Sequence, residues 1–219
     1  MERLVCLLIG YIFGLFQTGY FYGKTQGVDI RKMGSGNAGS TNALRTMGIK
    51  AGMITLLGDC FKCVIAVLVV RGIYGQSHAD ILPLLSLYTG FGAVLGHNFP
   101  FYLKFKGGKG IAASSGVVLS LLLFPKNCWV LSVLGLLTFA GVTYISKYVS
   151  LGSLVFIGLF FVEMVIYGIC GWLPLTGSSL YEGLVITFII TALAFIRHHG
   201  NIQRLINGTE RKIGQHKNN

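Results

Sequence analysis

Seven apolar runs dominate this chain of 219 residues and constrain its fold more than any other feature. A membrane-spanning helix needs roughly 17–25 predominantly apolar residues, and most of the runs approach that length. Only 11% of the residues are charged, whereas a soluble domain carries about 25%. We therefore expect an all-α polytopic membrane protein with seven transmembrane helices. The expected spans are residues 4–22, 51–70, 81–97, 110–124, 128–146, 149–170 and 180–197.

The 18 Lys and Arg residues fall mainly on one side of the membrane in this topology. The other side receives only Arg3, Arg71 and Lys126, and Lys62 lies within the second span. Cytoplasmic loops carry an excess of Lys and Arg, so we expect the N-terminus outside and the C-terminus in the cytoplasm. The basic residues expected on the cytoplasmic side are Lys24, Arg31, Lys32, Arg45, Lys50, Lys104, Lys106, Lys109, Lys147, Arg197, Arg204, Arg211, Lys212 and Lys217.

The net charge of +11 bears on the partners of the chain. The basic residues lie between apolar runs, which favours membrane lipids with anionic headgroups and phosphorylated small molecules as partners, and not nucleic acid. The five cysteines and five histidines have no ligand spacing for a metal site, so we expect neither metal nor cofactor. A single integral-membrane domain over residues 1–219, acting as a monomer, is the expected organisation.

A glycine-rich, polar segment, Met33–Arg45, lies in the loop after the first span and reads MGSGNAGSTNALR. Glycines let backbone amides approach an anion closely, and an arginine binds phosphate with two parallel hydrogen bonds. The alternative is a connecting loop in which Ser, Thr and Asn only cap the next helix. The candidate substrate-binding residues are Ser35, Gly36, Asn42 and Arg45, and the candidate catalytic residues are Asn37 and Thr41.

A second segment, Gly96–Gly110, closes the third span and leads into the fourth with the sequence GHNFPFYLKFKGGKG. A glycine loop before a helix offers free amides and the positive end of the helix dipole to a phosphate. Alternatively, its lysines only mark the cytoplasmic side. His97 is a candidate general base by residue type, or a cap at the end of its helix. The candidate substrate-binding residues are Lys104, Gly107, Gly108, Lys109 and Gly110.

A third segment, Arg197–Lys212, follows the last span and reads RHHGNIQRLINGTERK. At helical spacing Arg197, Asn201 and Arg204 share one face, as do His198 and Asn201. The alternative is a polybasic tail on anionic lipid. The candidate substrate-binding residues are His198, Asn201 and Arg204.

Charged residues also lie inside expected spans. Asp59 and Lys62 are three residues apart on one helical face. Charges within a membrane are costly and are usually paired or functional, so a structural ion pair and a catalytic role both stay open. Glu163 has no evident partner in the sequence.

The three segments together resemble the bacterial acyl-phosphate-dependent glycerol-3-phosphate acyltransferase family, PlsY. The family's motifs are similar to GSGNPGATN followed by an arginine, GHxFPxFxxFKGGKG, and RHHxNIxRL followed by GTE. FQTGY in the first span, the Asp59–Lys62 pair and SLGS at Ser150–Ser153 are lesser similarities. The departures, none at an expected phosphate ligand, are Ala38, Ser40, Cys63, Ala112, Ala113 and Gly200.

The resemblance implies a multi-pass enzyme of the bacterial plasma (inner) membrane. It would transfer a fatty acyl group from acyl phosphate to the 1-hydroxyl of glycerol-3-phosphate. The products are lysophosphatidic acid and phosphate, in phospholipid biosynthesis. The Gly107–Gly110 amides and Lys104 are then expected to hold acyl phosphate, and Ser35, Arg45, His198 and Asn201 to hold glycerol-3-phosphate. Asn37 and Thr41 would stabilise the oxyanion, and either His97 or a substrate phosphate would take the proton.

Two other functions compete with this one. A transporter or binding protein for phosphorylated metabolites also needs basic loops and intramembrane charge. Transport, however, predicts polar groups near the midplane of several spans, often in two similar halves, whereas the polar residues here lie at one face. A lipid-binding scaffold explains the basic tail and leaves the glycine loops unexplained.

Overall fold

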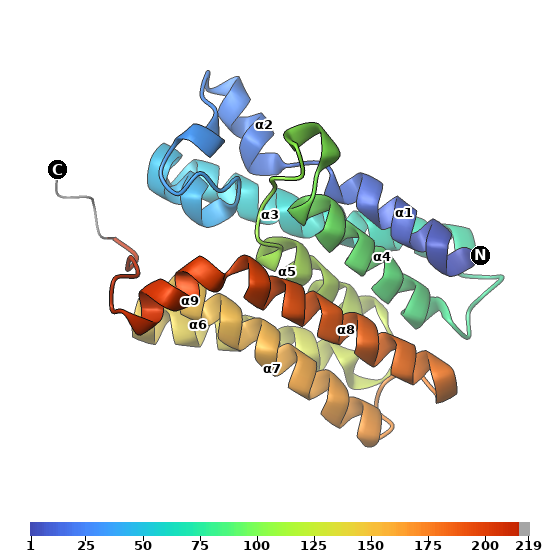
Figure 1. Cartoon of the computed structure of the whole chain (residues 1–219). Helices are drawn as coiled ribbons and strands as arrows, with labels where there is room; N and C mark the ends of the chain where they lie inside the picture. Colours follow the sequence, from blue (N-terminus) through green and yellow to red (C-terminus); the bar gives the residue numbers. More distant parts are fainter. Residues whose placement is uncertain (215–219) are drawn as a thin grey trace.

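The computed structural model describes residues 1–214, and within them it is all-helical, with no strand. Figure 1 shows the long helices side by side. The N-terminus lies at one end of this bundle, and the short helices α2 and α9 lie toward the other. The helices are α1 (Glu2–Gly14), α2 (Thr18–Thr25), α3 (Ser40–Tyr74), α4 (Leu82–Asn98), α5 (Ile111–Ser120), α6 (Trp129–Ser146), α7 (Val149–Ile169), α8 (Gly177–Arg197) and α9 (His199–Ile206).

Five helical segments of the described chain are long and apolar enough to cross a membrane. The helix α4 has 17 residues, and the apolar helix Ile111–Leu123 is shorter still. The prediction of an all-α polytopic protein is therefore confirmed, and the count of seven spans stays a prediction. The five long segments are Glu2–Thr25, Ser40–Tyr74, Lys126–Ser146, Val149–Ile169 and Gly177–Arg197.

The first expected span is interrupted where the chain leaves α1 and enters α2. Gln17 has an extended backbone (φ −95°, ψ 91°). Its buried side-chain amide donates hydrogen bonds to the carbonyls of Gly14, at 3.3 Å, and His97, at 3.0 Å. Carbonyls at helix ends lack partners, so this amide stabilises the ends of both α1 and α4.

The second expected span begins earlier in the structure than the sequence predicts. The helix α3 starts at Ser40, so the end of the first polar motif is helical. Gly48 has a backbone conformation outside the helical region (φ 87°, ψ 178°) and divides α3 into a short polar part and a long apolar part. Only glycine adopts such a φ without strain. The kink lets α3 contain both the end of the first polar motif and the apolar residues of the second expected span.

Small residues allow α1 and α4 to approach closely. A side chain at Gly10 or Gly14 of α1 would overlap the backbone of α4, and one at Gly92 or Gly96 of α4 would overlap that of α1. Each helix thus carries two glycines four residues apart, the spacing that brings membrane helices into backbone contact. This contact fixes the C-terminal end of α4, where His97 lies.

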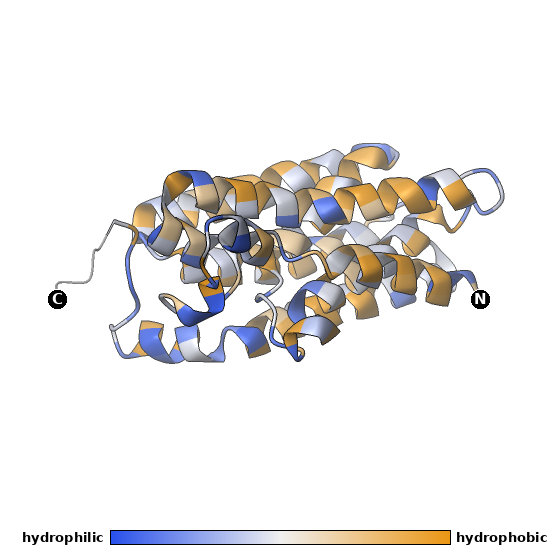
Figure 2. Ribbon diagram, turned by 90° about the horizontal axis from the view of Figure 1, so that it is seen from above, coloured by the Kyte–Doolittle hydropathy of each residue, from blue (hydrophilic) through white to orange (hydrophobic). Residues whose placement is uncertain are grey.

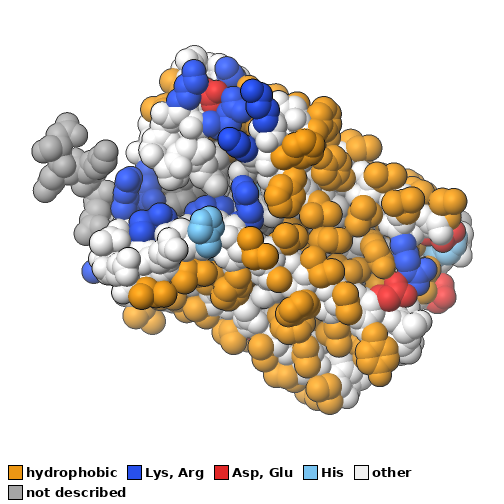
Figure 3. Space-filling model, viewed as in Figure 1, with side chains coloured by type: hydrophobic (Ala, Val, Ile, Leu, Met, Phe, Trp, Pro, Cys, Tyr) orange, Lys and Arg blue, Asp and Glu red, His pale blue; other side chains and the backbone are white. Residues whose placement is uncertain are grey.

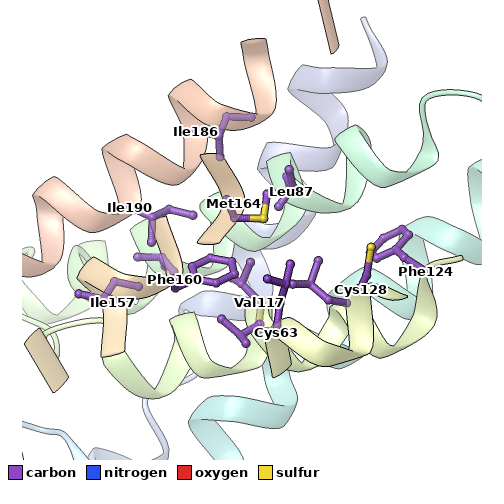
Figure 4. Close-up of a cluster of buried hydrophobic side chains, with 14 of the residues drawn as sticks. Cys63, Leu87, Val117, Phe124, Cys128, Ile157, Phe160, Met164, Ile186 and Ile190 are labelled. Carbon is purple, nitrogen blue, oxygen red and sulfur yellow. The ribbon is translucent and has the colours of Figure 1, made fainter. Parts of the chain in front are cut away.

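A buried apolar cluster holds the other helices together (Figure 4). Phe160 and Met164 of α7 lie between Ile190 of α8 and Val117 of α5, and Cys63 of α3 belongs to the same cluster. Transfer of one large apolar side chain from water to a protein interior is favourable by roughly 1.5–3 kcal/mol. The gain is smaller for a side chain that leaves lipid, because lipid is already apolar.

The outer surface separates into an apolar region and a basic end. Figure 3 shows hydrophobic side chains covering the long helices and Lys and Arg gathered near the end where α2 and α9 lie, and the hydropathy colouring in Figure 2 agrees. Large apolar residues such as Leu136 (67%), Ile145 (82%) and Ile169 (82%) are exposed, as lipid contact requires. Lys217, assigned above to the basic side, lies outside the described residues.

Candidate active site

A cavity of about 360 Å³ opens among α3, α5, α6, α7 and α9. Its lining joins a polar part to an apolar part, and both come from segments far apart in the sequence. Four of the predicted residues, Gly36, Lys104, Gly107 and Gly108, do not line it. The predicted residues that line it are Ser35, Asn37, Thr41, Asn42, Arg45, His97, Lys109, Gly110, His198, Asn201 and Arg204.

Asn42 organises the first motif. Its side-chain oxygen accepts from the amide of Ser35 (2.9 Å), and its side-chain nitrogen donates to the carbonyls of Ile30, Met33 and Asn37 at 2.9–3.2 Å. All of its polar atoms are thereby engaged, and the residue is buried. Asn42 therefore shapes the loop in the described structure, and the donors left to a ligand are on its neighbours.

The first motif also starts α3 at the cavity. Ser40 and Thr41 begin the helix, and the side-chain oxygen of Asn37 accepts from the amide of Gly39 at 2.8 Å. The first four amides of a helix have no partner within it, and the helix dipole attracts negative charge there. Arg45, exposed one turn later, lines the same cavity.

The glycine loop of the second motif is held by the backbone itself. The amides of Gly107 and Gly108 donate to the carbonyls of Asn98 and His97, at 3.2 and 3.1 Å. The carbonyls of both glycines accept from the guanidinium of Arg197. These two amides are therefore engaged, and Arg197 turns toward the loop instead of sharing a face with Asn201.

The cavity end of that loop is formed by Lys109, Gly110 and the first turn of α5. Gly110 precedes the helix with a left-handed backbone (φ 88°), which glycine adopts without a steric penalty. Lys104 is exposed and does not line the cavity. Of the phosphate ligands that the sequence predicts in this motif, only Lys109 and Gly110 line the cavity.

The third motif builds a charged network with the C-terminal segment. Glu210 is buried and accepts hydrogen bonds from Asn201 (2.8 Å), Arg204 (2.7 Å) and Ser150 (3.1 Å). The ammonium of Lys109 donates to the side-chain oxygen of Asn201. The hydrogen bonds of Glu210 and Asn201 thereby connect α7, α9 and the glycine loop at the cavity.

Burial controls the charges of this network. Desolvation, with help from nearby arginines, lowers the pKa of Lys109 to about 8. Desolvation and the neighbouring Lys109 lower the pKa of His198 to about 4, so this ring is neutral at pH 7. Desolvation raises the pKa of Glu210, but its hydrogen bonds from Arg204 and Asn201 outweigh that effect and the net pKa is lowered. The site therefore keeps a net excess of cations.

His198 presents a lone pair to the cavity. Its Nδ1 lies 2.7 Å from the carbonyl oxygen of Ala194, an atom that only accepts. The proton of the neutral ring is consequently on Nδ1, and Nε2 is an acceptor. A substrate hydroxyl is a suitable donor to it.

His97 is held by a buried network at the inner end of the cavity. Its Nδ1 lies 2.9 Å from Nζ of Lys62 and 3.7 Å from Oδ1 of Asp59. Lys62 and Asp59 are themselves 3.0 Å apart. The ion pair that the sequence placed within the second span therefore contacts a residue of the second motif.

Glu210 and Ser150 are among the residues that line the cavity without a role assigned from the sequence. Both belong to short similarities with the PlsY motifs, GTE and SLGS. An acidic residue does not suggest a phosphate site by itself. Its role as the acceptor that orients three donors depends on tertiary contacts.

The other part of the cavity lining is apolar. The apolar lining residues include Leu56 and Leu57 of α3, Leu119 of α5, and Leu136 and Phe139 of α6. Such a lining has no polar partner to offer and suits a hydrocarbon chain. The same cavity lining thus offers cationic side chains and apolar side chains.

Comparisons with known proteins agree with this geometry. The sequence profile of the glycerol-3-phosphate acyltransferase family matches residues 4–208. The chain belongs to this family. It is 41% identical to a glycerol-3-phosphate acyltransferase of Clostridioides difficile, over 98% of this chain and 97% of that protein. A relative from Thermotoga petrophila is 37% identical, over 96% of each.

Solved structures support the assignment. The crystal structure of PlsY, an integral membrane glycerol 3-phosphate acyltransferase, in its glycerol 3-phosphate form has a TM-score of 0.80 with 30% identity. The alignment covers 98% of this chain and 96% of that one. The lysophosphatidic acid form has a TM-score of 0.78 with 29% identity. The chain is therefore an acyltransferase of the membrane, with several spanning helices.

Proposed function

We propose that the chain transfers a fatty acyl group from acyl phosphate to the 1-hydroxyl of glycerol-3-phosphate, in a bacterial inner membrane. The products are lysophosphatidic acid and phosphate. One observation carries the proposal: a single cavity is lined both by cationic side chains and by a set of apolar side chains. Both substrates carry phosphate, and one carries a hydrocarbon chain, so the cavity matches them in charge and in polarity.

The glycerol-3-phosphate subsite is proposed to lie beside the first and third motifs. Arg45 and the amide-rich loop near Ser35 bind the phosphate, and His198 and Asn201 face the glycerol part. The neutral His198 accepts a hydrogen bond from a hydroxyl, which distinguishes a polyol from an alkyl phosphate. Arg204 adds positive charge and is oriented by Glu210.

The acyl phosphate subsite is proposed to lie at Lys109, Gly110 and the first turn of α5. Lys109 and the helix amides hold the phosphate, and the chain extends past Leu57 and Leu119 along the apolar part of the lining. Asn37 and Thr41 at the start of α3 remain the proposed oxyanion donors. The carbonyl carbon then lies between the two helix starts.

The reaction needs no covalent enzyme intermediate. The 1-hydroxyl oxygen bonds to the acyl carbon, and the bond from that carbon to the phosphate oxygen breaks. The hydroxyl proton is taken by a base, for which His97 and a substrate phosphate are the two candidates. Phosphate is already a good leaving group, so positioning and oxyanion stabilisation account for most of the catalysis.

The membrane topology is part of the proposal. Five long segments together with α4 and α5 make seven spans, with the N-terminus outside and the basic end in the cytoplasm. The gathering of Lys and Arg at one end supports this orientation. A tag at the C-terminus is expected to be accessible to protease only from the cytoplasmic side. We also expect the protein to be active as a monomer.

The function is tested with purified protein in nanodiscs. Palmitoyl phosphate and glycerol-3-phosphate are expected to give equal amounts of phosphate and lysophosphatidic acid, measured by colorimetry and mass spectrometry. Omission of glycerol-3-phosphate and replacement of the donor by palmitoyl-CoA are the controls. Folded protein that releases no phosphate in response to glycerol-3-phosphate would refute the proposal.

A further inference from the structure

Lys62 occupies an unusual position, buried beneath the cavity among groups that only accept hydrogen bonds. Its Nζ lies 2.6 Å from the carbonyl oxygen of Phe16, 3.1 Å from that of Gly14 and 3.0 Å from Oδ1 of Asp59. The fourth neighbour is Nδ1 of His97, at 2.9 Å. Three oxygen acceptors, one of them a carboxylate, stabilise an ammonium with three protons to donate.

This neighbourhood determines where the proton of His97 lies. An ammonium has no lone pair, so Nδ1 of His97 cannot donate to Lys62. Nδ1 therefore turns its lone pair toward the ammonium, whose three protons are shared among four acceptors. The proton of the neutral ring is then on Nε2. A doubly protonated ring would place an N–H of one cation 2.9 Å from another cation, which both charge and hydrogen-bond geometry disfavour.

The far side of the ring faces the glycine loop. A side chain at Gly108 would overlap Nε2 of His97, so the absence of a side chain there makes room for this atom. Nε2 has no hydrogen-bond partner among the described residues, and His97 lines the cavity. The ring thus connects the buried ion pair on one side to the cavity on the other.

We propose that Lys62 is a positioning residue that holds His97 as an Nε2–H donor toward the substrates. The inference rests on the proposed acyl transfer and concerns how the site performs it. His97 then donates a hydrogen bond to a phosphate oxygen or to the oxyanion, and it does not take the proton of the attacking hydroxyl.

Asp59 belongs to the same arrangement. Its Oδ1 accepts from the amide and the hydroxyl of Thr18, at 3.3 and 3.0 Å, and from Lys62. The start of α2 thereby fixes Asp59, which fixes Lys62. Without the lysine, Oδ1 of Asp59 would be the nearest charged group to Nδ1 of His97 and would favour a proton there.

The decisive measurement is the tautomer of His97 in the unmodified protein. Protein labelled with ¹⁵N-histidine in nanodiscs is examined by solid-state NMR near pH 7.5, and the signal of His97 is assigned by its loss in His97→Gln. The expected result is a protonated Nε2 and an unprotonated Nδ1. A protonated Nδ1 would overturn the inference, whether or not the protein is active.

Kinetics of paired variants test the role of the donor. Glutamine accepts from Lys62 through its carbonyl and donates through its amide, but it is not a base. His97→Gln is therefore expected to keep kcat within about 10-fold of the native value, and His97→Ala to lower kcat by about 100-fold. Equal loss in both variants, with unchanged KM, would show that His97 acts as a base.

Lys62→Met tests the positioning role, with Lys126→Met as the matched control. Lys126 also donates to two backbone carbonyls, those of Gly171 and Leu173, but at a distant pocket. Lys62→Met is expected to move the proton of His97 to Nδ1 and to lower kcat by about 100-fold, with KM for glycerol-3-phosphate changed less than threefold. Lys126→Met is expected to keep native turnover. A Lys62→Met protein whose His97 tautomer and kcat match the native ones would refute the proposal.

The two levels of failure are distinguishable. If the unmodified protein has no glycerol-3-phosphate-dependent activity, the proposed function fails, and the NMR signature is still readable. If the protein is active and Nδ1 of His97 carries the proton, only the positioning inference fails.

Discussion

His97 and His198 lie at the C-terminal ends of α4 and α8 and line the same cavity, but their rings are held in different ways. Nδ1 of His97 faces the Lys62 ammonium, and Nδ1 of His198 faces the Ala194 carbonyl. The first neighbour donates and the second accepts. One ring therefore presents a proton to the cavity and the other a lone pair.

The surroundings of the two rings differ as well. His97 belongs to a buried network of α1, α3 and α4 that is closed by backbone carbonyls. His198 lies beside a network that includes exposed Arg204 and the segment around Glu210. The hydrogen-bond partner of Nδ1, and not the residue type, therefore decides whether an imidazole donates to a ligand or accepts from it.

The largest loss of activity is expected from a substitution that removes the space for Nε2 of His97. Gly108→Ala would place a methyl group on that atom, and the loop cannot shift because its backbone is bonded to His97 and Arg197. We expect kcat to fall by about 100-fold or more, measured as phosphate release. Gly141→Ala, in open space on α6, is the control and should keep native activity. Native kcat in Gly108→Ala would mean that the position of the ring is unimportant.

The next largest effect is expected from the loss of His198, the imidazole that accepts a hydrogen bond. His198→Ala is expected to raise KM for glycerol-3-phosphate by about 10-fold, the cost of one hydrogen bond, with KM for acyl phosphate nearly unchanged. Because the pKa of His198 is about 4, this ring contributes no ionisation between about pH 6 and pH 9. A pH profile near neutrality that flattens in His198→Ala would contradict the neutral acceptor.

The sequence predicted the composition of the site better than its internal geometry. The motifs around Ser35, His97 and His198 line one cavity, because each follows or precedes an apolar helix at the same end of the bundle. Local patterns did not reveal that the amides of Gly107 and Gly108 bond to the end of α4. Such pairing depends on how the chain returns after residue 98.

Helix boundaries show the same limit. The apolar pattern located the long helices but not the break at Gln17 or the early start of α3. Both depend on polar side chains that bond to distant backbone, as Gln17 does to His97. Spacing rules in sequence describe neighbours three or four residues apart, and these partners are much farther away.

A pH effect of moderate size follows from Lys109. Its pKa is lowered to about 8, so the side chain is charged below that pH and loses its charge above it. If Lys109 holds a phosphate, kcat/KM for acyl phosphate should fall as pH rises through about 8. Lys109→Arg should keep its charge and move this decline to higher pH. An unchanged alkaline decline in Lys109→Arg would assign the titration to another group.

The smallest expected effect concerns the carboxylate that orients the His198 side of the cavity. The pKa of Glu210 is lowered in the folded protein. The native state therefore binds the proton less readily than the unfolded state, and the carboxylate stabilises the fold above the ordinary glutamate pKa. This stabilisation is lost as pH falls through the folded pKa. At pH 7 Glu210→Gln should lower the free energy of unfolding by about 1–2 kcal/mol, seen in thermal unfolding.

Glu182→Gln is the matched control for Glu210→Gln, because Glu182 also accepts from an arginine, Arg3, but does not line the cavity. Both variants should lose some thermal stability. Only Glu210→Gln should also raise KM for glycerol-3-phosphate, since it alone holds Asn201 and Arg204 in place. If the two variants had the same KM for glycerol-3-phosphate, the Glu210 network beside His198 would only stabilise the fold. His97 would still present a proton and His198 a lone pair, but the surroundings of His198 would not contribute to substrate binding.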